Sequence, residues 1–155
     1  MAVKGEISIK TADMGELEGP RENKTSLIYE FKHEVYLPSE SEENRLQGTR
    51  RITPFEIVKS IDRITPLLYN IVCSGVLCTD VMITLYRIAE QSGEEEQYFQ
   101  YKLNDAKIVS VLNWMPPTYL PENETIGHLE KVKILARKFT WTYLDGGITH
   151  EEEAF

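Results

Sequence analysis

Few side chains of the types that perform chemistry occur together in this sequence. The only two cysteines are Cys73 and Cys78, whose spacing lies outside the usual zinc knuckle and which have no second pair to complete a site. A chain made in a reducing compartment keeps such thiols free, so we expect two free, packed thiols at a helix end. His33, His128 and His150 lie in three separate segments, as surface or packed histidines commonly do.

Sequence motifs of known enzyme classes are also missing. The chain contains no G-x-S-x-G, P-loop or G-x-G-x-x-G pattern. His33-Glu34 begins like a zinc-protease motif, but Leu37 stands where the second histidine would be. The acidic runs at 42–43, 94–96 and 151–153 fall in predicted loops or turns, where charge is normally solvated. We therefore predict that the chain is not an enzyme and uses no metal or cofactor.

Aromatic residues are the remaining candidates for binding. Trp114, Trp141 and the group Tyr98, Phe99 and Tyr101 could form a stacking platform. Their strand-like spacing instead favours core or interface positions, where aromatic side chains are enriched.

The segment from Thr79 to Trp114 must position most of these aromatics. It reads as three strands, Thr79–Ile88, Glu95–Leu103 and Ala106–Trp114, separated by turns at 91–94 and at Asn104-Asp105. An antiparallel sheet with one face in water alternates between apolar and polar residues, yet both faces of these strands look apolar. One predicted face of the first strand carries Val81, Ile83 and Leu85 and the other Met82, Tyr86 and Ile88; in the third strand Ile108, Leu112 and Trp114 oppose Val109 and Val111.

Two apolar faces need two covers. One cover can be the chain's own core, and the other must be its single helix, a second sheet or a neighbouring subunit. This need for a second cover is the strongest functional indication in the residue pattern.

The rest of the chain supplies further strands and one helix. We predict strands over 3–10, 26–37, 52–61 and 130–143; a parity change between Ile134 and Phe139 indicates a bulge or bend near 135–138. Thr65 is the expected helix N-cap, Pro66 the first helical residue and Gly75 the C-cap. The apolar stripe that docks this helix is Leu67, Leu68, Ile71 and Val72.

The remaining segments are polar. Residues 11–24 and 115–123 read as loops, and 145–155 as a turn followed by an acidic end. Residues 38–50 form a long polar loop between strands, which favours a protruding arm.

Length and charge limit the possible functions. A chain of 155 residues forms a single domain, 1–155, with a core of its own. A net charge of −8 argues against a nucleic-acid partner. The longest apolar run, 71–78, is too short for membrane insertion, and the N-terminus lacks the features of a cleavable signal peptide. We expect a protein made in the cytoplasm whose export, if any, uses a route that reads no N-terminal peptide.

Several short segments, in order along most of the chain, resemble one family. They are His33-Glu34-Val35-Tyr36-Leu37-Pro38, Ile61-Asp62-Arg63-Ile64-Thr65-Pro66-Leu67-Leu68-Tyr69, Tyr86-Arg87, Tyr98-Phe99-Gln100-Tyr101-Lys102-Leu103, Ala106-Lys107-Ile108-Val109-Ser110, Met115-Pro116, His128-Leu129-Glu130-Lys131-Val132 and Trp141-Thr142-Tyr143-Leu144-Asp145-Gly146-Gly147. This set resembles the haemolysin-coregulated protein (Hcp) family, the tube subunits of type VI secretion systems.

The resemblance implies a mainly β fold: two packed antiparallel sheets forming a β-barrel, with one flanking α-helix and an extended loop. It implies hexameric rings that stack into a tube, which a contractile sheath exports to the extracellular space or a target cell. Effector proteins in the lumen and the sheath and spike proteins are the implied partners. Two alternatives stay open: a ring-forming effector chaperone or adaptor, and a phage tail-tube-like protein without a secreted role.

Two groups of residues are expected to make the contacts between copies. The resemblance places the inter-ring loop at Pro38, Ser39, Glu40, Glu43, Arg45, Leu46, Arg50 and Arg51. The aromatic and apolar strand positions Met82, Tyr86, Tyr98, Trp114 and Trp141 are candidates for the subunit interface.

Overall fold

The computed structural model describes residues 4–40, 45, 46 and 48–154. In this part of the chain the elements are, in order, β1 (Gly5–Thr11), β2 (Gly15–Glu16), β3 (Ser26–Lys32), β4 (Val35–Tyr36), β5 (Ser39–Glu40), β6 (Arg45–Leu46), β7 (Arg51–Ile52), β8 (Phe55–Ser60), α1 (Thr65–Ser74), β9 (Cys78–Ile88), β10 (Glu95–Trp114), the 3-10 turn η1 (Pro121–Asn123), β11 (Leu129–Tyr143) and β12 (Ile148–Glu153).

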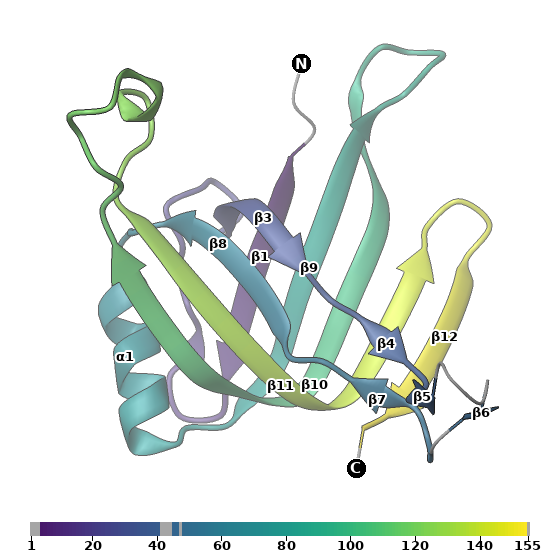
Figure 1. The fold of residues 1–155 in the computed structure, drawn as a ribbon. Coiled ribbons are helices and arrows are strands. Elements are labelled where there is room, and N and C mark those ends of the chain that lie inside the picture. The colour runs from purple at the N-terminus through teal and green to yellow at the C-terminus, as the bar shows by residue number, and fades with distance from the viewer. Residues whose placement is uncertain (1–3, 41–44, 47, 155) are drawn as a thin grey trace.

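Six strands close a barrel. Antiparallel pairing runs from β10 through β9, β1, β3 and β8 to β11, and β10 also pairs with β11, so the sheet returns to its first strand (Figure 1). The interior is filled by alternate residues of these strands, which are apolar with few exceptions. The predicted fold class, a mainly β barrel with one flanking helix, is confirmed.

The predicted turn at Asn104-Asp105 is wrong. β10 is one strand of 20 residues that passes through this point without reversing. Asp105 does have a positive φ of 49°, the property that made the pair look like a turn. Pairing decides the outcome, because β11 stays in register with β10 on both sides of Asn104-Asp105.

The predicted faces of the segment Ala106–Trp114 are also wrong. The register between β10 and β11 shifts between Ile108 and Ser110, so Val109 is the extra residue of a bulge. A bulge reverses the parity of the residues that follow it. Ile108 is therefore buried in the barrel, whereas Leu112 is 52% exposed on the outer side.

β11 shows the predicted change of parity as a bend. The buried residues of β11 have even numbers up to Ala136, and the next buried residue is Phe139. The register of β11 with β10 continues without a shift from Ile134 to Tyr143. Both long strands curve strongly at this level (Figure 1). The bend divides the other edge of β11: β8 pairs along 129–134 and β12 along 138–143.

Three other predicted boundaries change. The segment 26–37 divides into β3 and β4, and 52–61 divides into β7 and β8, with Pro54 at the break as expected for a residue that cannot donate to a ladder. The acidic tail predicted beyond a turn is a strand, β12, which pairs with β11 from Ile148 to Glu153. Cross-strand pairing outweighs the low β propensity of three successive glutamates.

The helix α1 packs against β10, in the region where β10 continues beyond its last partner on β9. Leu68 and Ile71 are fully buried, and Gly75 ends the helix in the left-handed conformation with a φ of 67°, as predicted. The predicted N-cap is wrong by one residue, because Ile64 occupies that position. The Thr65 hydroxyl accepts a hydrogen bond from the amide of Asp62 and donates one to Glu130, so it does not cap the helix.

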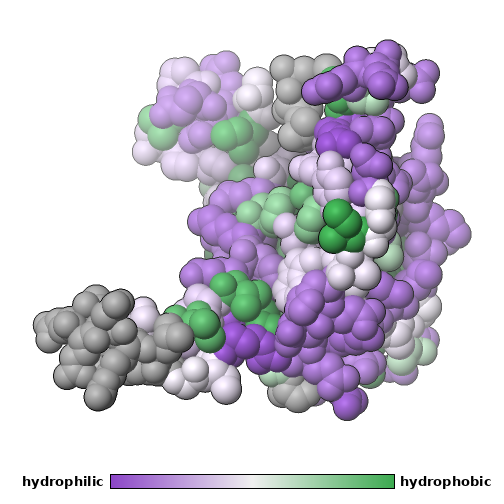
Figure 2. All heavy atoms as spheres, turned by 90° about the vertical axis from the view of Figure 1, so that its right-hand side faces the viewer, coloured by the Kyte–Doolittle hydropathy of each residue, from purple (hydrophilic) through white to green (hydrophobic). Residues whose placement is uncertain are grey.

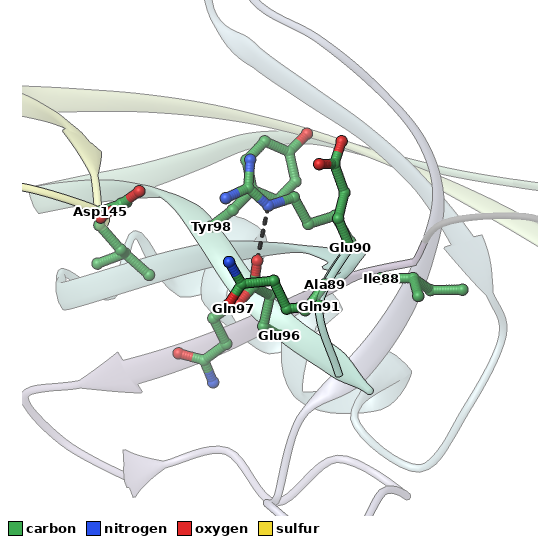
Figure 3. A pocket seen from close by; sticks show the side chains of 10 residues that line it. Ile88, Ala89, Glu90, Gln91, Glu96, Gln97, Tyr98 and Asp145 are labelled. Atoms are coloured by element: carbon green, nitrogen blue, oxygen red, sulfur yellow. Dashed lines mark hydrogen bonds and ion pairs between the residues drawn. The ribbon is translucent and has the colours of Figure 1, made fainter. Parts of the chain in front are cut away.

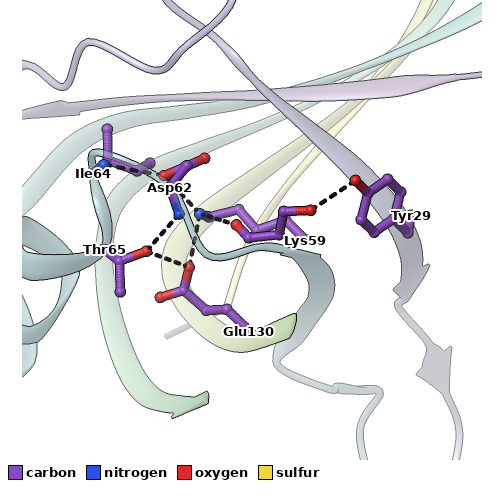
Figure 4. Close-up of polar contacts among 7 residues, drawn as sticks. Tyr29, Lys59, Asp62, Ile64, Thr65 and Glu130 are labelled. Atoms are coloured by element: carbon purple, nitrogen blue, oxygen red, sulfur yellow. Dashed lines mark hydrogen bonds and ion pairs between the residues drawn. The ribbon is translucent and has the colours of Figure 1, made fainter. Parts of the chain in front are cut away.

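A buried ion pair fastens the start of α1 to the barrel (Figure 4). Lys59 of β8 and Glu130 of β11 are both fully buried, with Nζ 2.7 Å from Oε2. The same ammonium lies 3.0 Å from Oδ1 of Asp62 and 3.1 Å from the carbonyl oxygen of Ser60. Three acceptors thus surround the three protons of Lys59, an arrangement that a buried ammonium needs to remain charged.

Candidate functional site

The described residues contain no cluster of three histidine, cysteine or acidic side chains that could hold a metal ion. Cys73 and Cys78 are both free; Cys73 is exposed on α1, whereas Cys78 is buried at the start of β9. Burial raises the pKa of the Cys78 thiol to about 11, which keeps it protonated and unreactive at neutral pH. The outer surfaces of the barrel, which other proteins can contact, are therefore the stronger candidates for a functional site.

The predicted arm begins as two small ladders. β4 pairs with β7, Val35 opposite Ile52, and β5 pairs with β6 further out. Figure 1 shows these short strands extending from one end of the barrel. Glu43 lies outside the described residues, and the structure describes only the backbone of Glu40, Arg45 and Leu46. Among the other predicted arm residues Ser39 and Arg51 are exposed, and Pro38 and Arg50 are half-buried.

Arg50 ties the base of the arm to the C-terminal strand. Its guanidinium donates to Oε2 of Glu152 at 3.0 Å and to the backbone carbonyl of Glu153. His150 contacts the second oxygen of Glu152 at 3.0 Å. Arg50, and secondarily His150, hold the pKa of the Glu152 carboxyl below its ordinary value. The arm therefore has a charged anchor on β12.

An aromatic cluster lies beneath this anchor. The ring of His33, which follows β3, stacks on Phe55, Phe139 and Trp141 at centroid distances of 5.1, 5.2 and 5.8 Å. Trp141 stacks in turn on His150 at 5.9 Å. Both ring nitrogens of His33 are buried without a hydrogen-bond partner among the described residues. Burial lowers the pKa of His33, so the imidazole is neutral and packs as an aromatic ring.

One outer surface of the sheet is almost entirely polar. The pairing registers of β1, β9, β10, β11 and β12 place three cross-strand rows on this surface. We call it the polar face, and its members are Lys10, Asp80, Asn104, Lys138 and Glu153; Ser8, Met82, Lys102, Thr140 and Glu151; and Glu6, Thr84, Gln100, Thr142 and Thr149. Neighbours bond within it, as Asn104 does to Asp80 at 2.6 Å. The loop 17–25 overhangs one end and encloses a hollow of about 390 Å³.

The opposite outer surface is different in character. Val132, Ile134 and Ala136 are buried, so the residues between them point outward, and the register adds their β10 neighbours. We call this surface the basic face, and its members are Lys107, Val109, Ser110, Leu112, Trp114, Lys131, Lys133, Leu135 and Arg137. Val109, Leu112 and Leu135 are 45, 52 and 38% exposed. The second apolar surface inferred from the sequence therefore lies here, and the outer side of β9 belongs to the polar face.

A notch of about 740 Å³ lies between the β9–β10 turn and the β11–β12 turn (Figure 3). Arg87 is its central charge. Its guanidinium donates to Glu96 at 2.9 Å and to the hydroxyl of Tyr143 at 3.1 Å, and it lies 5.2 Å from the ring centre of Tyr98. Arginine with tyrosine is a common combination at the energetic centre of protein interfaces.

The predicted interface residues do not gather on one surface. Met82 belongs to the polar face. Tyr86 lines the hollow beside the loop 17–25, where its hydroxyl donates to Glu6 at 3.0 Å, and Tyr98 lines the notch. Trp114 is on the basic face with the ammonium of Lys131 6.0 Å from its ring. Trp141 points inward and packs against the core. Their assignment to the subunit interface stays a prediction.

Some notable residues had no distinct signal in the sequence. Lys59 and Glu130 read as ordinary charged strand residues, and only parity could have indicated burial: Lys59 alternates with Phe55 and Ile57, and Glu130 with Val132. His33 read as one of three scattered histidines. Lys133 and Arg137 form a small basic group in the sequence; alternation in β11 places Leu135 between them, and the bulge at Val109 adds Leu112 to the same surface.

In the part of the chain that the structure describes, no helix is long and apolar enough to cross a membrane.

Comparison with known proteins agrees with this architecture. A family model described as "Type VI secretion system effector, Hcp" matches residues 1–143. The chain is 33% identical over 127 residues to the "Major exported protein" of Pseudomonas aeruginosa, which covers 82% of this chain and 73% of that protein.

Solved structures of similar proteins superpose over nearly the whole chain. An Hcp protein crystal structure aligns with a TM-score of 0.91 at 24% identity and covers 99% of both chains. An Hcp1 variant from E. coli EAEC 042 aligns with a TM-score of 0.86 at 29% identity, over 99% of this chain and 100% of that one. The secreted protein Hcp3 from Pseudomonas aeruginosa aligns with a TM-score of 0.79 at 26% identity, over 98% of each. This chain therefore belongs to the Hcp family of type VI secretion system proteins.

Proposed function

We propose that this chain is the structural subunit of a secretion tube and not an enzyme. Copies form hexameric rings, the rings stack, and the resulting hollow tube is exported and carries effector proteins in its lumen. Membership in the Hcp family supports this role, and a curated relative carries the name "Major exported protein". The number of six subunits rests on the family resemblance.

The observation that carries the proposal is the contrast between the two outer surfaces. The basic face leaves three aliphatic side chains 38–52% exposed, and each contributes about 1 kcal/mol when a neighbour covers it, since full burial of such a side chain is worth about 1.5–3 kcal/mol. Most side chains of the polar face are exposed or half-buried and can hydrogen-bond to water, while Glu6 and Thr84 are buried and Glu6 is paired with Arg21 and Tyr86. A neighbouring copy is therefore needed on one surface and not on the other.

A ring arranges these surfaces consistently. When one patch on a subunit binds a different patch on the next, the contact repeats and closes if the rotation permits. The polar face can then line the lumen and stay hydrated. Its threonine, glutamine, serine and asparagine side chains can bond weakly to a protein cargo without holding it permanently.

The arm supplies the contact along the tube axis in this proposal. It extends from one end of the barrel (Figure 1), and its base is anchored by Arg50 on Glu152. Removal of residues 40–47 should weaken stacking and leave rings intact, because the basic face is untouched. Sheath and spike proteins are the further partners of the assembled tube.

Native mass spectrometry and negative-stain microscopy of the purified chain test the proposal. We expect a six-subunit species and annular particles that join into tubes at high concentration. A particle that stays monomeric at every concentration would refute ring formation. Rings that never stack, or medium that contains equal amounts of the chain with and without a functional sheath, would instead favour a chaperone or adaptor.

A further inference from the structure

His33 lies at the point where the arm leaves the barrel. β3 ends at Lys32 and β4 begins at Val35, so His33 belongs to neither strand. The next residue, Glu34, joins the two chains of the arm here. Its amide donates to the hydroxyl of Thr53 at 2.9 Å, and its carbonyl accepts hydrogen bonds from the Thr53 amide at 2.9 Å and the Thr53 hydroxyl at 3.1 Å. We call these three bonds the root clasp, and the segments 33–37 and 50–53 the arm root.

The arm root has little other support. The ladder between β4 and β7 consists of two residue pairs. Val35 and Leu37 are 43 and 50% exposed, and apolar side chains gather where the arm leaves the barrel, at the lower left of Figure 2. Segments with short ladders and few buried contacts open more easily than a barrel core. A change at His33 can therefore open the root without unfolding the barrel.

The imidazole of His33 is held by its neighbouring rings. It stacks on Phe55, Phe139 and Trp141, and Tyr101 meets it edge-on with 6.1 Å between the ring centres. Both ring nitrogens are buried without a hydrogen-bond partner among the described residues. A neutral ring can pack in this way, but an imidazolium has a charge and two N–H donors that need acceptors. The surrounding rings offer cation–π attraction, which replaces neither hydrogen bond.

A hollow of about 540 Å³, open to solvent, lies beside the ring. His33 lines it together with two carboxylates, Glu34 and Glu56, and two cations, Lys32 and Lys133. Both lysines are exposed, so their ammonium groups can turn into water. The hollow therefore supplies the water and the carboxylate oxygens that the aromatic cluster lacks.

We propose that His33 is a pH-sensitive latch on the arm. At neutral pH its ring completes the aromatic cluster and the root clasp is closed. In acid the protonated ring leaves the cluster for the hollow, Glu34 moves with it, and the root clasp opens. The opening itself does not depend on the proposed tube, whereas its effect on the stacking of rings rests on the proposed function.

The direction of the switch follows from the two environments of the ring. In the closed root burial lowers the pKa of His33, and the nearby backbone of Thr53 has a smaller, opposite influence. In the open root the ring is hydrated, and its pKa returns toward the ordinary value of 6.5. The open form therefore binds the proton first as pH falls. The ratio of open to closed root should rise by up to about tenfold for each pH unit below 6.5.

The other titratable groups around the ring do not produce this change. Tyr101 stays neutral because burial raises its pKa. Glu56 and Glu152 stay ionised from pH 8 to pH 5, because hydrogen bonds from a lysine and an arginine hold the pKa of each carboxyl below its ordinary value. His150 contacts Glu152, so a proton on His150 strengthens the arm's anchor and opposes the opening.

Hydrogen exchange read by mass spectrometry tests the latch in the full chain, at one protein concentration below that at which rings stack. Peptides that cover 31–38 and 49–56 report the arm root, and a peptide that covers 78–85 of β9 reports the barrel. The intrinsic pH dependence of exchange is subtracted. Protection of the root should be constant from pH 8 to pH 7 and should fall by up to about tenfold from pH 6 to pH 5, while protection of β9 stays unchanged.

Two variants and one spectroscopic signal assign the proton. His33→Phe keeps an aromatic ring in the cluster and binds no proton, so its root should be equally protected from pH 8 to pH 5. His150→Gln is the matched control at the other histidine near the root and should retain the fall. In the unchanged chain the ring ¹⁵N shifts of His33 should change over the same pH range as the protection, which tests the latch even if His33→Phe does not fold.

The outcomes separate the latch from the proposed function. Root protection that is independent of pH in the unchanged chain overturns the latch. An equal fall in His33→Phe, or a His33 ring that titrates while the root stays protected, also overturns it. Micrographs at pH 8 and pH 5.5 address the tube: its absence at both values refutes the proposed function and not the latch, whereas tubes that shorten in acid only when His33 is present extend the latch to stacking.

Discussion

Replacement of Lys59 by methionine tests whether the Lys59 ammonium stabilises the buried carboxylate of Glu130. Methionine matches the length of the lysine stem and removes the ammonium. The carboxylate of Glu130 then keeps only the hydroxyl of Thr65, at 3.0 Å, as a donor, and its other oxygen is already buried without a partner among the described residues. Asp62 loses its 3.0 Å contact with the same ammonium.

The expected cost follows from this geometry. Both side chains of the pair are fully buried, and removal of one member of such a pair typically costs about 3–5 kcal/mol, because an uncompensated charge stays in the interior. A domain of this size loses roughly 2–4 °C of Tm for each kcal/mol. Lys59→Met should therefore lower Tm by about 6–20 °C.

A second variant separates the charge from the packing. Lys59→Met combined with Glu130→Leu removes both charges and keeps similar volumes, so most of the lost stability should return. Lys102→Met, at an exposed lysine of the polar face, is the matched control and should change the free energy of unfolding by less than about 0.5 kcal/mol. All four proteins are compared by thermal and urea unfolding at one protein concentration, because assembly shifts apparent stability.

Either of two results would show that Lys59 does not compensate the buried charge of Glu130. A loss of less than about 1 kcal/mol in Lys59→Met would mean that the ammonium does not compensate Glu130. A double variant that is less stable than Lys59→Met would mean that the carboxylate does not depend on its cation.

Three further predictions concern other parts of the chain. The pKa of His33 lies below 6.5 in the folded protein, so the unfolded chain binds the proton first as pH falls. The stability of the folded state should therefore decrease as pH drops below about 6.5. Tm measured from pH 8 to pH 5 should fall less steeply in His33→Phe than in the unchanged chain, and an equal slope would contradict this. A Cβ at Gly19 would collide with backbone atoms across its loop, whereas Gly127 faces open space, so thermal unfolding of Gly19→Ala should show a loss of about 1–3 kcal/mol and Gly127→Ala almost none. Arg50→Gln should raise the pKa of Glu152 toward its ordinary value and speed amide exchange in β12, both measurable by NMR; an unchanged titration would exclude the anchor.

Much of the architecture could be predicted from local signals. Alternation along the strands indicates a mainly β chain, the family resemblance implies the barrel, and Pro66 with Gly75 indicates the helix to within one residue at its start. These signals are reliable because they report the conformational limits of individual residues. The turn at Asn104-Asp105 failed for the same reason: the pair has turn chemistry, but pairing with β11 keeps it within a strand.

The candidate surfaces were less accessible to sequence reasoning. The residue pattern predicts that both faces of the strands in 79–114 are apolar and that one of them needs a second cover, but it does not locate that face. One extra residue at Val109 moves Leu112 and Trp114 to the outside together, and the outer side of β9 joins a polar surface instead. The composition of 148–153 predicts an acidic tail, and only the pairing with β11 makes this segment a strand.

The sequence by itself determined the class of fold, the family and the presence of more apolar strand surface than an ordinary barrel can hide. Only the tertiary structure decided where that surface lies and which charges surround it. The physical reason is that alternation along a strand specifies two faces but not which of them points inward. Register, bulges and the partner on each edge make that choice, and they depend on residues distant in the chain.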